Sequence, residues 1–470
     1  MKQKRSFDPR ATAWITGTCL AASVSMSASA ADPQIHGPIP GTPPGDPLAE
    51  QVEDTYPFFA TVDDLAGNGY VEEEFHLYGE AEAFDGDGDQ QADGVPYRTR
   101  IVVRRPEHPA HFNGTVLMEW QNVTAGYDLD ALWNGDHIMR SGYAWIGVSA
   151  QRVGVDQLTE WSPVRYGELD VTGDGAFEDD QLSYNIFEQA AMAARGATET
   201  DPMAGLDVER VLGIGASQSA GRMTTYYDNI LPQREEAVFD GYGFIVGSAP
   251  SRDGDAPVFH VLSETDVMTP LGRRADSEVY RRWEVAGTAH SGHQGQVYRE
   301  PISERDLADG APEYDCSNPP FSRAPLHHVT AAAYDHLDNW VAGNGQPPSA
   351  PYLEFDGLSM VRNELGLAQG GIQLSQVTAP TALNTGTNSG EVFCFLFGTH
   401  EPFDDETLAE LYRNHGDYVS QVVSTDNANV EAGYILRDDA RENIRDAARS
   451  DVGKQRGRQD HPQGGPPGRR

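Results

Sequence analysis

The chain has 470 residues, of which 34 are lysine or arginine and 72 are aspartate or glutamate, and its formal net charge is −38. Hydrophobic residues make up 39% of the sequence, which is enough for a folded core. The acidic balance argues against nucleic acids and anionic membrane surfaces as partners, because both require clustered basic side chains. The only lysines are Lys2, Lys4 and Lys454, which argues against Schiff-base chemistry and against a phosphate-binding loop that ends in lysine.

Residues 1–30 are predicted to be a signal peptide. A basic start with Arg5 and Arg10 precedes a mildly apolar stretch over 11–24, and Ala28-Ser29-Ala30 has the form of an A-x-A cleavage site. The apolar stretch is shorter than a membrane span, and no later segment reaches about eighteen apolar residues. We therefore expect an exported protein, periplasmic or extracellular, without a membrane span.

Beyond the signal peptide, the sequence predicts a linker, a large core, an extension and a tail. Residues 31–50 are rich in proline and predict a linker. From 51 to 345, short apolar segments alternate with helical patterns, which is typical of a wound α/β sheet with buried parallel strands. Residues 346–450 are expected to form a C-terminal extension packed on this core, and residues 451–470 a disordered tail.

The expected elements can be given in chain order. Two antiparallel strands over 70–80 and 97–105 precede buried strands over 115–120, 143–149, 211–215, 242–246, 258–262 and 283–287. Helices are expected over 184–195, directly after residue 217, and over 327–341. The extension is expected to contain strand-like segments and a helix over 408–423.

After signal-peptide cleavage, two cysteines remain, Cys316 and Cys394. An even number of cysteines in an oxidising compartment predicts one disulfide. The alternative is two buried free thiols.

The segment from Val211 to Arg222 predicts a nucleophile at Ser217. An apolar strand ends at Gly215, and a helix begins immediately after the serine. So tight a strand-to-helix turn accepts only small neighbours, such as Gly215 and Ala220. The motif departs from G-x-S-x-G, because Ser219 occupies the place of the second glycine. Ser219 is also a rival nucleophile, because Ser217-Gln218-Ser219-Ala220-Gly221 nearly satisfies the same pattern one step further along. We favour Ser217 because it follows the strand directly; the alternative role for it is an ordinary helix N-cap.

An acid and a histidine follow at the ends of later strands. Asp266 comes just after the strand over 258–262, with Glu264 as the alternative acid. His290 comes just after the strand over 283–287, with His293 as the alternative base. The carboxyl ends of parallel strands meet at one edge of a sheet, and Ser, acid, His is the chain order of α/β-hydrolase triads.

Two backbone N–H groups are predicted to bind an oxyanion. The first belongs to Gln218, at the start of the helix after the nucleophile, where the helix dipole is positive. The second is assigned to Asn122, in the loop that follows the strand over 115–120.

Taken together, these motifs resemble those of a family of secreted bacterial and fungal proteins called alpha/beta hydrolase domain proteins. The resembling segments are 79–81, 96–100, 114–123, 165–167, 215–220, 263–266, 283–290 and 398–403, together with both cysteines. The resemblance spans roughly residues 60–450, so it includes the extension. It implies an α/β-hydrolase fold with a mostly parallel doubly wound sheet, and it supports the triad Ser217, Asp266 and His290. It names no substrate.

Two acidic loops, at residues 85–93 and 170–180, are predicted to be solvated turns, so no cofactor and no metal are expected. The second loop has the early spacing of a calcium-binding EF-hand at Asp170 and Asp174. Its twelfth position, however, is Gln181, where a bidentate acid is needed. A structural calcium ion is the alternative interpretation.

The sequence thus favours a secreted serine hydrolase that cleaves a small carboxylic ester by acyl transfer. One alternative is an amidase or lactonase that uses the same triad. Another is a non-catalytic secreted binding protein with acidic, calcium-binding loops. The pocket is expected to be covered by the C-terminal extension or by residues 151–181.

Overall fold

The computed structural model describes residues 33–454. The predicted signal peptide and residues 455–470 of the predicted tail lie outside the described residues. Within the described part of the chain, no helix is both long and apolar enough to cross a membrane.

A nine-stranded sheet forms the centre of the molecule, in the order β1-β2-β3-β5-β4-β6-β7-β8-β9. The strands in this sheet are β1 (Gln34–His36), β2 (Tyr70–Phe84), β3 (Gln90–Pro106), β4 (Thr115–Trp120), β5 (Ala144–Val148), β6 (Arg210–Ala216), β7 (Gly241–Ile245), β8 (Val258–Ser263) and β9 (Tyr280–Val285). β1, β2 and β3 pair antiparallel, β3 pairs antiparallel with β5, and the pairs from β5 to β9 are parallel. The structure confirms a mostly parallel sheet with antiparallel early strands.

The helices and two small sheets complete the fold. The helices are α1 (Gly135–Ser141), α2 (Arg152–Trp161), α3 (Pro163–Tyr166), α4 (Ser183–Ala194), α5 (Gln218–Thr225), α6 (His293–Asp306), α7 (Leu326–Val341), α8 (Ser375–Thr378), α9 (Cys394–Phe397), α10 (Asp405–Leu411), α11 (His415–Ala432) and α12 (Arg437–Arg449). The small sheets pair β10 (Phe355–Asp356) with β11 (Ser359–Met360) and β12 (Ala382–Thr385) with β13 (Thr399–Pro402).

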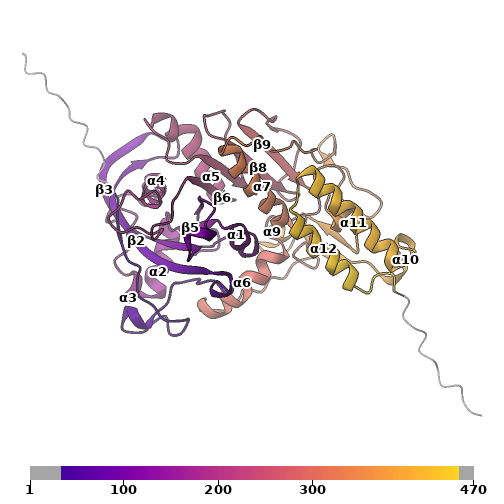
Figure 1. Cartoon of the computed structure of the whole chain (residues 1–470), viewed down its shortest axis with the longest axis horizontal. Helices are drawn as coiled ribbons and strands as arrows, with labels where there is room; N and C mark the ends of the chain where they lie inside the picture. The colour runs from indigo at the N-terminus through magenta and orange to yellow at the C-terminus, as the bar shows by residue number, and fades with distance from the viewer. Residues whose placement is uncertain (1–32, 455–470) are drawn as a thin grey trace, which may run out of the picture.

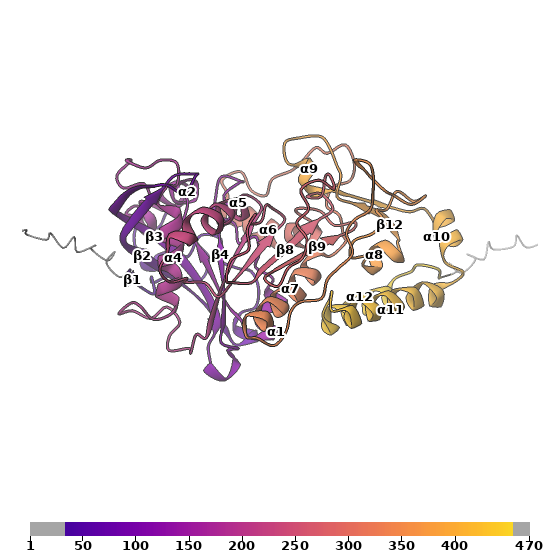
Figure 2. The same cartoon turned by 90° about the horizontal axis from the view of Figure 1, so that it is seen from above.

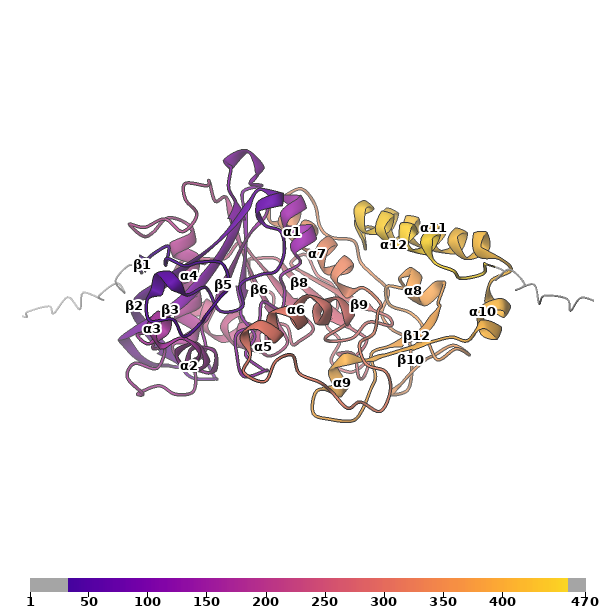
Figure 3. The same cartoon turned by 90° about the horizontal axis from the view of Figure 1, so that it is seen from below.

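Helices cover both faces of the large sheet (Figures 2 and 3). The side chains of β4 alternate between two hydrophobic cores, because successive residues of a strand point to opposite faces. Val116 and Met118 pack with α4 and α5 on one face, whereas Leu117 packs with α1 and α7 on the other. The sheet is therefore buried on both sides, as its continuous apolar strands predict.

The start of the predicted linker is part of the sheet. β1 pairs with β2, placing Gln34 opposite Tyr78 and His36 opposite His76, and the side chain of Ile35 is buried. Prolines concentrate after this strand, so their presence did not prevent residues 34–36 from pairing at the sheet edge.

The predicted single helix over 408–423 is wrong. Two helices, α10 and α11, replace it, and each has its own N-cap. The Asp404 side chain accepts a hydrogen bond from the Thr407 N–H, and the Asn414 side chain accepts one from the Asp417 N–H. Each cap satisfies a backbone donor that would otherwise be unpaired, so the chain starts a new helix at residue 415. α12, which is not among the elements predicted from the sequence, packs against α11.

The C-terminal extension lies beyond β9, at the end of the molecule opposite β2 and β3 (Figure 1). Its backbone joins the sheet at Ile372, whose N–H donates to the Glu284 carbonyl and whose carbonyl accepts from the Ala286 N–H. Ile372 and Ile435 also share a hydrophobic core with α7. Hydrogen bonds and apolar packing thus tie the extension to the core.

Candidate active site

Ser217 lies on the tight turn between β6 and α5. Its backbone has φ 57° and ψ −117°, a left-handed conformation that is strained for any residue with a side chain. The Ser217 N–H donates to the Ile245 carbonyl, and the Gly221 N–H donates to the Ser217 carbonyl, so both sides of the turn are fixed. A Cβ atom on Gly215 would lie 2.6 Å from the Met223 sulfur, and one on Gly247 would lie 2.7 Å from the Ser217 carbonyl oxygen. Small residues are therefore favoured at the end of β6 and just after β7.

Asp266 and His290 are brought together at the carboxyl ends of β8 and β9. The Nδ1 atom of His290 lies 2.7 Å from Oδ1 of Asp266, and each side chain is only 13% exposed. Oδ2 of Asp266 accepts a hydrogen bond from the Ser263 hydroxyl at 2.5 Å. The His290 N–H donates to the Thr265 hydroxyl at 3.2 Å. Backbone and side chain together orient the imidazole.

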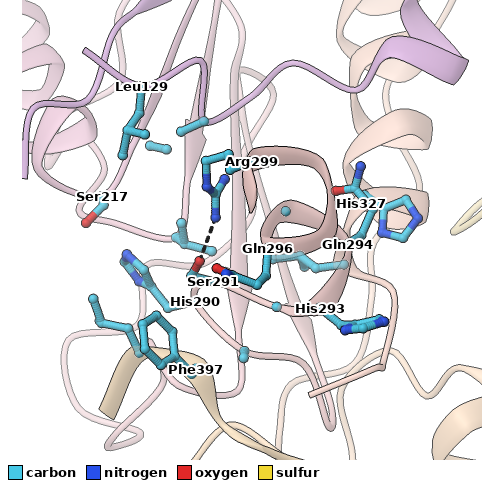
Figure 4. A pocket seen from close by; sticks show the side chains of 18 of the residues that line it. Leu129, Ser217, His290, Ser291, His293, Gln294, Gln296, Arg299, His327 and Phe397 are labelled. Carbon is cyan, nitrogen blue, oxygen red and sulfur yellow. Dashed lines mark hydrogen bonds between the residues drawn. The ribbon is translucent and has the colours of Figure 1, made fainter. Parts of the chain in front are cut away.

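Ser217 and His290 line the same cavity, whose volume is about 290 Å³. Figure 4 shows both side chains on the same side of that cavity. A serine on a strained turn and a histidine that is hydrogen-bonded to a carboxylate therefore line one cavity. This arrangement fits nucleophilic catalysis, in which the histidine acts as base and the carboxylate orients it.

The rival residues occupy different environments. Ser219 is fully buried inside α5, and its hydroxyl has no hydrogen-bond partner in the described part of the chain. Glu264 is also buried and binds Arg362 instead of a histidine. His293 lines the cavity at the first position of α6, where burial and then the charge of Arg323 lower its pKa. The geometry favours Ser217, Asp266 and His290 over these alternatives.

The two predicted oxyanion donors differ in availability. The Gln218 N–H opens α5 and donates to no acceptor among residues 33–454. The Asn122 N–H donates to the Leu129 carbonyl at 3.3 Å, and the Leu129 N–H donates back at 2.9 Å. This bridge corrects the Asn122 assignment, because its N–H is already used. The next N–H along the loop, that of Val123, has no acceptor in the described residues.

Asn122 instead connects the loop after β4 to the turn between β6 and α5 that carries Ser217, which we call the elbow. Its side-chain Nδ2 donates to the Ala216 carbonyl at 3.0 Å, and its Oδ1 accepts from the Thr124 N–H at 2.9 Å. The loop after β4 is thus held against the residue that precedes Ser217.

The cavity wall comes from the loop after β4, from the His290 loop with α6, and from the extension. Phe393, Leu396 and Phe397 of the extension line it, whereas no residue between 151 and 181 does. The C-terminal region therefore covers the pocket. The structure joins Cys394 to Cys316 by a disulfide, which ties the segment bearing these apolar side chains to the segment before α7.

The acidic loops use their carboxylates internally. Oδ1 of Asp85 accepts from the N–H groups of Asp87 and Asp89, both at 3.0 Å. Asp170 accepts from the Thr172 N–H at 2.8 Å and the Asp174 N–H at 2.7 Å. Among residues 33–454, no group of three or more histidine, cysteine or acidic side chains is arranged to hold a metal ion.

Several lining residues were not foreseen from the sequence. Arg299 lies in the cavity and donates to the Ser291 hydroxyl at 3.0 Å (Figure 4). His327 also lines it, and burial, followed by the proximity of His328, lowers the His327 pKa well below its usual range. The only signal for Arg299 is its spacing from Gln296 and Ser303, which puts the three on one helix face.

Esterases and other hydrolases are among the solved structures similar to this chain. Esterase Est22 is 12% identical with a TM-score of 0.27, and the match covers 43% of this chain and 66% of Est22. A bacterial heroin esterase is 12% identical with a TM-score of 0.25, covering 43% of this chain and 68% of its own. A putative dienelactone hydrolase from Klebsiella pneumoniae subsp. pneumoniae MGH 78578 is 13% identical with a TM-score of 0.22, covering 41% and 74%. These likenesses are too low to indicate a substrate.

A search of curated proteins returned no match. The model of the alpha/beta hydrolase domain family, in contrast, matches residues 35–445, which include the sheet, the Ser217 turn, the Asp266–His290 pair and most of the extension. The chain therefore belongs to the alpha/beta hydrolase domain family.

Proposed function

We propose that the protein is an exported serine hydrolase that cleaves carboxylic esters of small molecules. The observation that carries this proposal is the 2.7 Å contact between His290 Nδ1 and Asp266 Oδ1 at a cavity that Ser217 also lines. A buried carboxylate fixes the tautomer of the imidazole, so Nε2 is free to accept a proton.

In the proposed reaction, Ser217 Oγ attacks the ester carbonyl carbon while its proton passes to Nε2 of His290. The tetrahedral intermediate collapses, the C–O bond to the alcohol breaks, and His290 returns the proton to the departing alcohol. A water molecule then attacks the acyl-serine, again giving a proton to His290. Release of the acid and return of that proton to Ser217 regenerate the enzyme.

The N–H groups of Gln218 and Val123 are the proposed oxyanion donors. Neither donates to an acceptor within residues 33–454. Each is next in sequence to residues that line the cavity: Gln218 follows Ser217, and Val123 lies between Asn122 and Thr124. Donors that are already oriented stabilise the negative charge without reorganisation during the reaction.

Export is part of the same proposal. The Cys316–Cys394 disulfide supports it, because disulfides persist mainly in oxidising compartments. The amino-terminal pattern with its A-x-A site supports it independently.

The decisive test is labelling of the purified protein with a fluorophosphonate, followed by peptide mass spectrometry and by assays on 4-nitrophenyl esters. We expect label on Ser217 and ester hydrolysis that the label abolishes. A folded protein that neither reacts with the probe nor hydrolyses the esters would contradict the proposal. Parallel assays on matched amides and lactones decide between ester hydrolysis and the alternative reactions of the same triad.

A further inference from the structure

Arg299 is a cation in the cavity that has no carboxylate partner among residues 33–454. Among residues 33–345, every arginine forms an ion pair with a carboxylate except Arg252, Arg299 and Arg323. Arg252 donates to the Tyr227 carbonyl and does not line the cavity, whereas Arg299 and Arg323 do. In a chain with such an excess of acids, two unpaired guanidinium groups at one cavity call for a specific explanation.

The position of Arg299 is fixed from two sides. On the preceding residue of α6, the Tyr298 hydroxyl donates to Oδ2 of Asp130 at 2.6 Å, and the same oxygen lies 2.7 Å from the Arg104 guanidinium. This buried network anchors the helix to the loop after β4. The Arg299 guanidinium itself donates to Ser291, the residue directly after His290. The guanidinium is therefore hydrogen-bonded to the residue next to the proposed base, as Figure 4 shows.

The surroundings of Arg299 are suited to an anion. Glu300 is the only carboxylate among the lining residues; it is exposed and forms no ion pair with Arg299. Tyr127 and Tyr314 line the same cavity, and burial raises the pKa of both hydroxyl groups. These hydroxyls stay protonated at neutral pH, so they are further neutral hydrogen-bond donors in this cavity.

A partly buried guanidinium without a counter-charge is unfavourable, and a carboxylate satisfies it through two parallel hydrogen bonds. We propose that Arg299 selects ester substrates that carry a free carboxylate, which binds its guanidinium during catalysis. Arg323, exposed at the cavity wall, adds positive charge at the entrance. A single partly buried guanidinium, in a cavity that also offers neutral hydroxyl donors, matches a monoanion better than a phosphate dianion. The inference rests on the proposed ester hydrolysis and specifies its substrate class.

The test compares esters that differ only in replacing a terminal methyl group by a carboxylate. On the acyl side, the pair is 4-nitrophenyl pentanoate and mono-4-nitrophenyl glutarate; on the alcohol side, it is butyl acetate and 4-acetoxybutanoate. In at least one pair, we expect kcat/KM to favour the acid by about tenfold or more. Arg299→Gln should lower the acid-to-neutral ratio by about tenfold to a hundredfold, because hydrogen bonds to charged groups are of this strength. Arg299→Lys should keep part of the preference, since it retains the charge but not the planar fork.

Arg449→Gln is the matched control, because it removes one positive charge from an exposed position on α12 and should leave the ratio unchanged. Equal loss on both members of a pair in Arg299→Gln would show that Arg299 only supports the His290 loop, and no preference in either pair would equally overturn the inference. Binding of the same esters to Ser217→Ala, measured by calorimetry with and without Arg299→Gln, needs no turnover. If the wild-type protein hydrolyses none of these four esters, the proposed function fails. The ratio of acid to neutral ester affinity, with and without Arg299→Gln, then decides the role of Arg299 alone.

Discussion

Glu264 and Asp266 lie two residues apart on the turn after β8, yet their carboxylates contact different parts of the molecule. Asp266 binds His290 at the cavity. Glu264 accepts hydrogen bonds from the Gly287 N–H at 2.7 Å and from the Gly386 N–H at 3.0 Å, and it pairs with Arg362 at 2.6 Å. One turn thus carries the proposed catalytic acid and the carboxylate that joins the extension to the core.

Replacing each of these two acids by its amide should show that one is needed for activity and the other for stability. We expect Asp266→Asn to lower kcat by about 10⁴-fold, because the imidazole loses its tautomer and its counter-charge, while the melting temperature changes little. Glu264→Gln should lower the free energy of unfolding by roughly 1–3 kcal/mol, since it leaves Arg362 and buried N–H groups poorly paired, and should keep kcat within a few-fold. Ester kinetics and thermal unfolding of both variants check this; an inactive Glu264→Gln beside a normal Asp266→Asn would show that the acid is misassigned.

The two serines of the elbow should also behave differently. Ser217→Ala should abolish hydrolysis and fluorophosphonate labelling without unfolding the protein. Ser219→Ala should keep activity and leave stability unchanged or slightly higher, because it removes a fully buried hydroxyl that has no partner in the described residues. Labelling of the Ser217→Ala variant at Ser219 would contradict the assignment of the nucleophile.

The backbone strain at Ser217 can be measured without reference to activity. Its φ of 57° and ψ of −117° suit glycine, which has no Cβ atom. Ser217→Gly should therefore be more stable than Ser217→Ala by about 1 kcal/mol. Urea unfolding of the two inactive variants provides the comparison, and equal or reversed stabilities would mean that the turn is not strained.

Asp426 should make the protein less stable as the pH rises. It is buried on α11, and neither of its oxygens has a well-formed hydrogen bond within the described residues. Burial raises its pKa from 3.8 to about 6, against the smaller opposing influence of the Ser375 and Asn443 side chains. Between these two values the folded state holds a proton that the unfolded state has released, so stability falls through this interval and the full cost is present above pH 6. Asp426→Asn should therefore stabilise the protein at pH 8 by roughly 1–3 kcal/mol and by less at pH 5.

Thermal unfolding at the two pH values tests this prediction. Glu431→Gln is the control, because it removes an exposed carboxylate from the same helix and should show no such pH dependence. A stabilisation by Asp426→Asn that is equal at pH 5 and pH 8 would be inconsistent with a titrating buried carboxylate.

Removing the disulfide should weaken both the fold and the pocket. The bond closes a loop of 78 residues and holds the segment with Phe393 and Phe397 at the cavity. Replacing both cysteines by serine should lower the free energy of unfolding by roughly 2–5 kcal/mol and raise KM more than it lowers kcat. A reductant should cause the same loss of stability and the same rise in KM in the wild type, and it should have no effect on the double variant. An unchanged KM in the double variant would show that the pocket wall does not depend on the disulfide.

The sequence by itself determined most strands of the sheet, the strand-to-helix turn at Ser217 and the chain order of the proposed triad, but not β1, which lies in the predicted linker. Apolar strands followed by small residues are local features of a sequence. The structure confirms the predicted strand and helix on either side of Ser217, which are β6 and α5. The cap residues Asp404 and Asn414 are also local signals, and they indicate two helix starts. The continuous helical pattern of apolar residues over 408–423 nevertheless predicted one helix, without the break between α10 and α11.

Tertiary structure alone decided which of two neighbouring acids faces the histidine, since Glu264 is committed to Arg362, almost a hundred residues later in the chain. It also decided that the Asn122 N–H is occupied by Leu129, and that Arg299 has no carboxylate partner within the described residues although the chain contains 72 acidic residues. Hydrogen-bond partners, burial and counter-charges depend on which segments, distant in the sequence, pack against each other. Local sequence patterns do not specify these long-range contacts.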